Sequence, residues 1–196
     1  MRIISGEYGG RRFNPPSNMP YTRPTTDVAK EGLFNVIQNN LDIAELKTLD
    51  LFGGTGSISY ELASRGAKEL TIVEKDNQMF DFIKKTAAGL KIENLKAVKM
   101  DVFKFIQTST EKFDFIFAGP PYALTHIDDL PRLIFEKKLS FNLWQSTQQF
   151  FHHQKLISFI SGHRHRLCFF IRIIYLAKKN SFFQIYHLRW IDPCFA

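Results

Sequence analysis

Apolar residues in the first 139 positions follow two alternating patterns. Runs of six residues that are rich in branched and aromatic side chains are typical of buried strands, and they lie at 47–52, 69–74, 95–100 and 113–118. Segments with apolar residues near helical spacing follow these runs, at 58–65, 77–90, 102–107 and 131–138. Because strands and helices alternate through short loops, we predict an α/β fold with a mostly parallel sheet and helices on both faces.

The residues before this region predict a hairpin and a connector. Two short stretches, 2–4 and 11–13, flank Gly9 and Gly10, and glycine tolerates the backbone angles of a tight turn. Four prolines between residues 14 and 24 predict an irregular, extended connector. We therefore expect residues 1–24 to form a hairpin and connector ahead of a core domain at 25–139.

A helix is predicted from Thr25 or Thr26 to about Asn40. A threonine hydroxyl can cap the first turn, and Asp27 in that turn complements the helix dipole. The buried stripe of this helix is expected to contain Val28, Phe34, Ile37 and Leu41.

The chain changes character after residue 139. Residues 140–196 hold seven Lys/Arg, one acidic residue and five of the six histidines, so almost all of the net charge of +7 comes from this segment. Only 167–176 is a candidate strand. The abrupt change favours a shifted reading frame, which would leave the sheet without edge strands and expose apolar surface. A genuine basic RNA-binding tail and a divergent completion of the sheet are the alternatives.

Length and cysteine content narrow the class of protein. The 196 residues suit one compact domain, and Cys168 and Cys194 have neither disulfide-framework nor metal-ligand spacing. The start of the chain lacks the apolar core of a signal peptide. The longest apolar run, 167–177, is interrupted by Arg172 and is too short to span a bilayer. We expect a monomeric cytoplasmic protein that binds no metal and no membrane.

The loop that follows the first predicted strand carries specific chemistry. Residues 49–57 read Leu-Asp-Leu-Phe-Gly-Gly-Thr-Gly-Ser, a strand end that turns into a helix. Gly53, Gly54 and Gly56 let the backbone approach a ligand at the helix start, where amide groups face the space above the strand ends. The carboxylate of Asp50 would attract the positively charged methionine part of S-adenosylmethionine.

Acidic residues also end the next two strands. Glu74 is placed to accept hydrogen bonds from a ribose diol, and Asp101 from an adenine amino group. A dinucleotide could use a similar loop, but the third glycine of its GxGxxG pattern is Ser59, and Asp50 would repel a pyrophosphate. A purely structural turn is the other alternative.

The fourth strand ends in Phe-Ala-Gly-Pro-Pro-Tyr, residues 117–122. Pro-Pro-Tyr at a strand end is typical of enzymes that methylate amino groups of nucleobases, since the tyrosine can stack on a flipped-out base. Such enzymes have Asp or Asn before the prolines to accept one N–H bond, while a backbone carbonyl accepts the other. Gly119 holds that position here, so we predict that cofactor binding survives and methyl transfer is severely weakened. The alternative is a purely structural role, in which Pro-Pro-Tyr forms a rigid turn that caps the strand.

Five stretches together resemble one family: 1–13, 22–37, 49–67, 72–76 and 113–122. They are similar to the bacterial 16S ribosomal RNA guanine-N2 methyltransferases of the RsmD type, over about residues 1–139. The resemblance implies a Rossmann-like methyltransferase fold with S-adenosylmethionine as cofactor. It also implies a guanine in 16S rRNA, free or in a small-subunit assembly particle, as the target.

The resemblance assigns roles to individual residues. The methionine end of the cofactor would be lined by Asp50, Gly53, Gly54 and Gly56, with Phe52 beside them. Glu74 and Lys75 would lie at the ribose, and Asp101 with Val102 at the adenine. The platform for the target base would be Gly119, Pro120, Pro121 and Tyr122. RNA phosphates would contact Arg11, Arg12 and Arg23, whose alternative role is that of solvated surface charges.

Two other functions remain open beside rRNA methylation. The same Pro-Pro-Tyr chemistry serves enzymes that methylate adenine or cytosine in DNA. A catalytically inactive relative that still binds cofactor or RNA is the alternative from another class, and Gly119 favours it.

Overall fold

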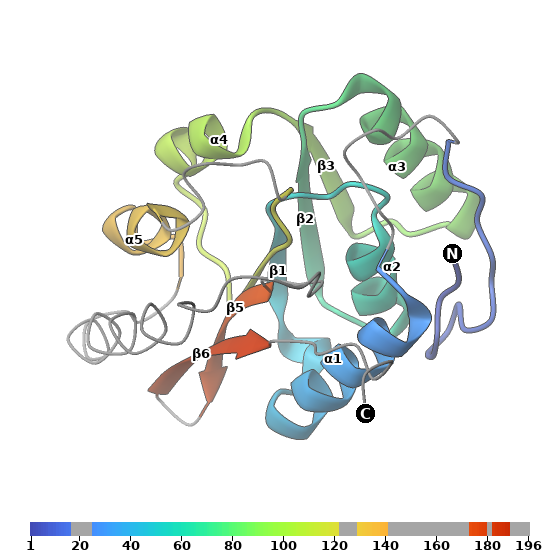
Figure 1. The fold of residues 1–196 in the computed structure, drawn as a ribbon, viewed down its shortest axis with the longest axis horizontal. Helices are drawn as coiled ribbons and strands as arrows, with labels where there is room; N and C mark the ends of the chain where they lie inside the picture. Colours follow the sequence, from blue (N-terminus) through green and yellow to red (C-terminus); the bar gives the residue numbers. More distant parts are fainter. Residues whose placement is uncertain (17–24, 122–128, 141–172, 180–181, 189–196) are drawn as a thin grey trace, which may run out of the picture.

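A six-stranded sheet runs through the computed structural model of the chain (Figure 1). Its strands are β1 Lys47–Asp50, β2 Glu69–Glu74, β3 Leu95–Lys99, β4 Phe115–Ala118, β5 Ile173–Lys179 and β6 Phe182–Leu188. Their order is β3-β2-β1-β4-β5-β6; the first four are parallel, β5 pairs antiparallel with β4, and β6 pairs antiparallel with β5. The structure describes residues 1–16, 25–121 and 129–140, and the backbone of β5 and β6.

Helices connect the parallel strands as the alternating pattern predicts. They are α1 Asp27–Asn40, the short 3-10 helix η1 Ile43–Glu45, α2 Ser57–Ser64, α3 Asn77–Leu90, α4 Val102–Thr108 and α5 Asp129–Glu136. The α/β fold class is therefore confirmed. Most element ends fall within two residues of their predicted positions.

The helices cover the two faces of the sheet separately (Figure 1). On β4, Phe115 and Phe117 pack into one apolar cluster with α1, α2 and α3, whereas Ile116 and Ala118 pack into a second cluster with α4 and α5. This alternation follows from the strand geometry, in which successive side chains point to opposite faces. The central strands β1 and β4 are thus buried on both faces, and their ends are left to form a site.

Helix α1 begins where the sequence predicts, but one of its predicted buried residues is exposed. The Thr26 hydroxyl caps the helix by accepting a hydrogen bond from the Ala29 amide at 3.3 Å. The predicted buried position of Val28 is wrong, because this side chain is 61% exposed. The predicted burial of Phe34 and Ile37 is confirmed, and Ala29 and Leu33 share their face of the helix.

The N-terminal residues form the predicted antiparallel pair. The Ile3 amide donates to the Arg11 carbonyl at 3.0 Å, the Phe13 amide donates to the Met1 carbonyl at 3.0 Å, and Arg2 lies opposite Arg12. Gly10 has a positive φ of 81°, as expected for the glycine at this turn.

The C-terminal segment contributes edge strands to the sheet, which the sequence analysis did not expect. The strands β5 and β6 extend the sheet beyond β4, and Ile116 pairs with Leu176 in the antiparallel register. Only 173–176 of the candidate strand 167–176 falls within β5; its earlier residues lie outside the described part of the chain. The three readings of this segment stay predictions: a shifted reading frame, a basic RNA-binding tail and a divergent completion of the sheet.

Candidate active site

The parallel register brings the ends of β1, β2 and β4 to one edge of the sheet. Asp50, the last residue of β1, is in register with Ile72 of β2 and with Phe117 of β4. Beyond it, the Leu51 amide donates to the Phe117 carbonyl at 2.9 Å, and the Gly53 amide donates to the Val73 carbonyl at 3.0 Å. The glycine loop after β1 therefore lies between the segments that follow β2 and β4.

The glycines of this loop are required by its geometry. Gly54 and Gly56 have positive φ angles of 51° and 76°, a conformation that side-chain-bearing residues rarely adopt. A Cβ on Gly53 would lie 2.6 Å from Cγ1 of Ile72, and one on Gly56 would lie 2.5 Å from Cζ of Tyr60. The loop thus lies directly against the sheet and α2, and its backbone is available to a ligand.

Asp50 is a buried carboxylate with one oxygen satisfied and one not. It is 2% exposed, and its Oδ2 accepts a hydrogen bond from the Ser59 hydroxyl at 3.0 Å. Oδ1 has no hydrogen-bond partner among the described residues. Burial raises the pKa of Asp50 to about 7, against the opposing effects of the Ser59 hydroxyl and the Phe52 amide. An unpartnered buried carboxylate oxygen suits a cationic or N–H-bearing ligand, which fits the methionine end of S-adenosylmethionine.

Glu74 ties the glycine loop to the end of β2. Its Oε2 accepts from the Gly54 amide at 2.7 Å, and its Oε1 accepts from the amides of Lys75 and Asp76, both at 2.8 Å. A carboxylate offers about four acceptor positions. Glu74 therefore shapes the loop, a role that the sequence did not suggest, and keeps about one further acceptor position.

Asp101 lies at the end of β3 and begins α4. Its Oδ1 caps the helix by accepting from the Phe103 amide at 3.0 Å, while its Oδ2 is 3.7 Å from Nζ of Lys75. The Val102 side chain is buried in the cluster beneath α4, and Phe52 packs partly against the same cluster. Lys75 and Asp101 thus meet across the ends of β2 and β3, while Val102 faces the core.

Gly119 and Pro120 follow β4 directly, on the edge that carries the glycine loop. Gly119 is exposed and is not among the glycines with a positive φ. A Cβ built on it would approach Cε1 of Phe117 at 3.2 Å and would otherwise meet only Cζ of the same ring, at 3.5 Å. Among the described residues, a side chain here therefore requires only the Phe117 ring to shift, by a few tenths of an ångström. Pro121 ends this described stretch, and Tyr122 lies outside the described residues.

Two of the predicted RNA-binding arginines are exposed on the N-terminal hairpin. The Arg11 guanidinium lies 5.5 Å from the centre of the Tyr8 ring, and Arg12 lies opposite Arg2. The third predicted arginine, Arg23, lies outside the described residues. The hairpin reaches the site through Phe13, whose ring centre is 5.6 Å from that of Tyr60.

Sequence reasoning missed the parts played by Ser59 and Tyr60. Ser59 was noted only as a break in a glycine pattern, yet its hydroxyl is the side-chain partner of Asp50. Tyr60 backs Gly56 and is fully buried. The polar residues of α2, in the segment directly after the glycine loop, were the signal that could have identified them.

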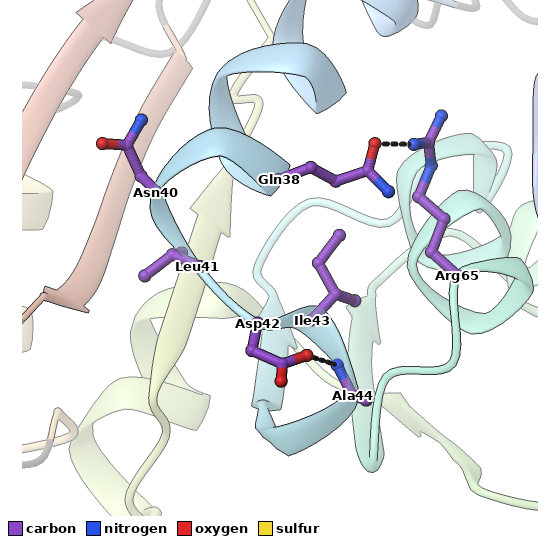
Figure 2. Close-up of a pocket in the computed structure, with 7 residues that line it drawn as sticks. All are labelled: Gln38, Asn40, Leu41, Asp42, Ile43, Ala44 and Arg65. Carbon is purple, nitrogen blue, oxygen red and sulfur yellow. Dashed lines mark hydrogen bonds between the residues drawn. The ribbon is translucent and has the colours of Figure 1, made fainter.

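A hollow at the opposite end of the sheet contains none of the predicted site residues. It has a volume of about 530 Å³ and lies between the end of α1, η1 and Arg65 (Figure 2). The Arg65 guanidinium donates to Glu61 at 2.8 Å and to Gln38, and it lies 4.7 Å from the centre of the Phe34 ring. Arg65 is thus a structural residue. Within the described residues, no cluster of three metal-binding side chains occurs, and no helix is long and apolar enough to cross a membrane.

Comparison with known proteins places this chain in a family. The family model described as Conserved hypothetical protein 95 matches residues 1–156, which extends past the predicted limit at residue 139. "Ribosomal RNA small subunit methyltransferase D" of Buchnera aphidicola is 34% identical over 64% of this chain and 63% of its own. The protein of that name from Escherichia coli K12 is 33% identical over 62% of this chain and 60% of its own.

A solved structure supports the same assignment. The Escherichia coli protein yhhF, provisionally named as a methyltransferase, superposes with a TM-score of 0.66 at 28% identity, covering 72% of this chain and 76% of its own. The chain spans about three fifths of the length of the two rRNA methyltransferases. Its fold is a Rossmann-like methyltransferase fold, and the resemblance to the RsmD type is confirmed. The chain belongs to the family described as Conserved hypothetical protein 95.

Proposed function

We propose that this chain binds S-adenosylmethionine and methylates the exocyclic N2 of a guanine in 16S rRNA, at a rate lowered by Gly119. Two relatives named as small-subunit rRNA methyltransferases support the substrate class. The observation that carries the proposal is Oδ1 of buried Asp50, which has no partner among the described residues. It lies where β1 leads into the glycine loop, beside the Gly119-Pro120-Pro121 turn. The protein would act as a cytoplasmic monomer on rRNA or on an assembly particle.

The cofactor would lie across the ends of β1, β2 and β3. When bound, it supplies a methyl group on a positively charged sulfur. Asp50 would accept from the cationic methionine end, and the loop glycines would let that end approach the backbone. Glu74 would accept from a ribose hydroxyl with its remaining acceptor position, and Oδ2 of Asp101 would accept from the adenine amino group. Lys75, which now lies 3.7 Å from that oxygen, would move aside or cover the adenine.

The target base would lie against the turn after β4. The nitrogen of an exocyclic amino group is a weak nucleophile because its lone pair is delocalised into the ring. Two acceptors on its hydrogens would localise that lone pair, and Gly119 leaves only backbone carbonyls for this role. Loss of one such polar contact lowers rates by on the order of a hundredfold or more. Pro120 and Pro121 would hold the turn rigid, and Tyr122 would stack on the base.

A second candidate is a catalytically inactive relative that binds cofactor or RNA. The specific observation in its favour is again Gly119, because an exposed position with space for a side chain has none. The two candidates predict the same cofactor affinity and differ in methyl transfer.

The experiment compares the wild type with Gly119→Asp, Gly119→Asn and Gly119→Ala. Titration calorimetry measures binding of S-adenosylmethionine, and transfer of a labelled methyl group is measured on unmethylated 16S rRNA and on duplex DNA. We expect equal cofactor affinity for all four proteins and transfer to rRNA about a hundredfold faster for Asp or Asn. Gly119→Ala is the matched control, since it adds a Cβ without an acceptor.

The outcomes separate the hypotheses. No gain from Asp or Asn in proteins that bind the cofactor would contradict the proposed role of position 119 and favour the inactive relative. Transfer to DNA in place of rRNA would identify a DNA amino-methyltransferase. Absence of cofactor binding in every variant would contradict the assigned cofactor site itself.

A further inference from the structure

Two arginines face each other on the N-terminal hairpin. Arg2 and Arg12 are directly opposed in the antiparallel pair, and both are exposed. Like charges in this arrangement repel each other, so the pair costs stability in the absence of an anion. Together with Met1 and Asp27 they line a hollow of about 370 Å³. The like-charged pair and the hollow it lines are the features of a site for an anion.

Only part of this positive charge is neutralised within the protein. Nε of Arg2 donates to Oδ2 of Asp27 at 3.1 Å, and the buried Lys30 approaches the other oxygen of Asp27 at 3.7 Å. No carboxylate among the described residues pairs with Arg12. The contact through Nε orients the Arg2 guanidinium and leaves its two terminal nitrogens for a ligand. A guanidinium held in this way suits the oxygens of a phosphate.

The hairpin beneath the two arginines is held rigidly by buried polar groups. Both oxygens of Glu61, which is fully buried, accept from hairpin amides: Oε2 from Ile4 at 2.8 Å and Oε1 from Ser5 at 3.1 Å. Lys30 donates to the Arg2 carbonyl, so the backbone that carries this guanidinium is fixed from below. A fixed backbone lowers the entropy lost when a ligand is bound.

Further contacts join the hairpin to the glycine loop. The Tyr8 amide donates to the Ser64 hydroxyl at 2.9 Å, which fastens the far side of the turn to the end of α2. Phe13, the residue after Arg12, packs on Tyr60, and Tyr60 in turn covers Gly56. Arg12 is therefore connected to the candidate cofactor loop through the packing of Phe13 on Tyr60 and of Tyr60 on Gly56.

We propose that Arg2 and Arg12 together bind one phosphate group of the RNA backbone. This proposal rests on the proposed rRNA substrate and adds Arg2, which the sequence did not single out. A phosphate bound between the two guanidiniums offsets their mutual repulsion, and Asp27 keeps Arg2 oriented toward the phosphate. The phosphate positions the RNA with respect to the loop and the Gly119 turn, without reading its sequence.

The test measures the affinity of a 16S rRNA transcript as a function of salt concentration. The proteins are the wild type, Arg2→Gln, Arg12→Gln, the double variant and Arg132→Gln. Arg132 is the matched control, because it is a half-exposed arginine on α5, across the sheet from the hairpin. Cofactor affinity and thermal midpoint, measured on each protein, show whether the fold and the loop are intact.

We expect each single variant to bind RNA roughly tenfold more weakly. In the double variant, the slope of log affinity against log salt concentration should become shallower by about one, because one phosphate contact releases about one counterion. Arg132→Gln should behave as the wild type. A loss of about two units in the double variant would mean two separate phosphates and would overturn the shared site. Unchanged affinity in the double variant would also overturn it and would leave the proposed function standing. A wild type that binds no RNA would contradict both.

Discussion

The ring of Tyr60 lies against Gly56, so that a Cβ on Gly56 would be 2.5 Å from Cζ and 2.6 Å from Oη of the tyrosine. Phe13 of the hairpin packs on the same ring. The glycine loop, α2 and the hairpin are therefore one packed unit. The shape of the candidate cofactor site depends on residues that no ligand need touch.

Replacement of Gly56 by alanine is expected to destabilise the protein and weaken cofactor binding. The substitution combines a left-handed backbone, at about 1 kcal/mol, with a clash against a buried ring, at about 1–3 kcal/mol. Gly66→Ala is the control, since its φ is 86° but no atom of the described residues lies within 4 Å of its added Cβ. Urea unfolding should give a clearly larger loss for Gly56→Ala. Equal losses would show that Tyr60 moves away freely.

Asp50 should make the cofactor-free protein less stable as pH rises. Its pKa is raised from 3.8 to about 7 on folding, so the folded state binds the extra proton between these values. The free energy of unfolding therefore falls from pH 4 to pH 7, by on the order of 4 kcal/mol at about 1.4 kcal/mol per pKa unit. Asp50→Asn should remove this fall and be the more stable protein at pH 8. Parallel stability curves for the two proteins would contradict the raised pKa.

Ionisation of the Asp50 carboxyl should also control the affinity for the cofactor. A cationic ligand favours the charged carboxylate, so wild-type affinity should rise as pH increases through 7. Ser59→Ala removes the hydroxyl that favours the charged form, which should move the rise to higher pH. Calorimetry between pH 6 and pH 9 measures both curves. Coincident curves would show that Ser59 has no effect on Asp50.

Aspartate at position 119 should be tolerated by the fold. The nearest obstacle is Cε1 of Phe117 at 3.2 Å from a built Cβ, and the site is exposed. We expect a change in unfolding free energy within about 0.5 kcal/mol, as at ordinary surface positions. At Gly53, by contrast, a Cβ would meet Ile72 at 2.6 Å, so Gly53→Asp should unfold at a much lower temperature. A large loss in Gly119→Asp would mean that the turn after β4 is less open than its backbone indicates.

Glu61→Gln should release the hairpin and destabilise the domain. The neutral amide leaves Lys30 and Arg65 without their buried partner, and breaking a buried ion pair costs about 3–5 kcal/mol. Hydrogen exchange at the Ile4 and Ser5 amides should accelerate. Glu31→Gln, at an exposed position of α1, is the control and should change stability by less than about 0.5 kcal/mol. Retained protection of the two amides would contradict the anchoring role of Glu61.

The local elements could be predicted because their signals are local. The strand at 69–74 and the helix at 77–90 have the predicted bounds, since turn residues and periodicity both lie within the segment. Val28 was misplaced because the direction of a helix face depends on what it packs against. The pairing of β5 with β6 could not be foreseen, because no clear amphipathic period runs through residues 140–196.

The sequence by itself determined the α/β order, the glycine loop, and which acids end the strands. Those features depend on short spacings and on backbone freedom at particular residues. Tertiary structure alone decided that Glu74 holds Gly54 and that Arg2 opposes Arg12. It also decided that one oxygen of Asp50 has no partner in the described part of the chain. These relationships join residues up to twenty positions apart, and their energies depend on burial and on the placement of charges, which exist only once the chain is packed.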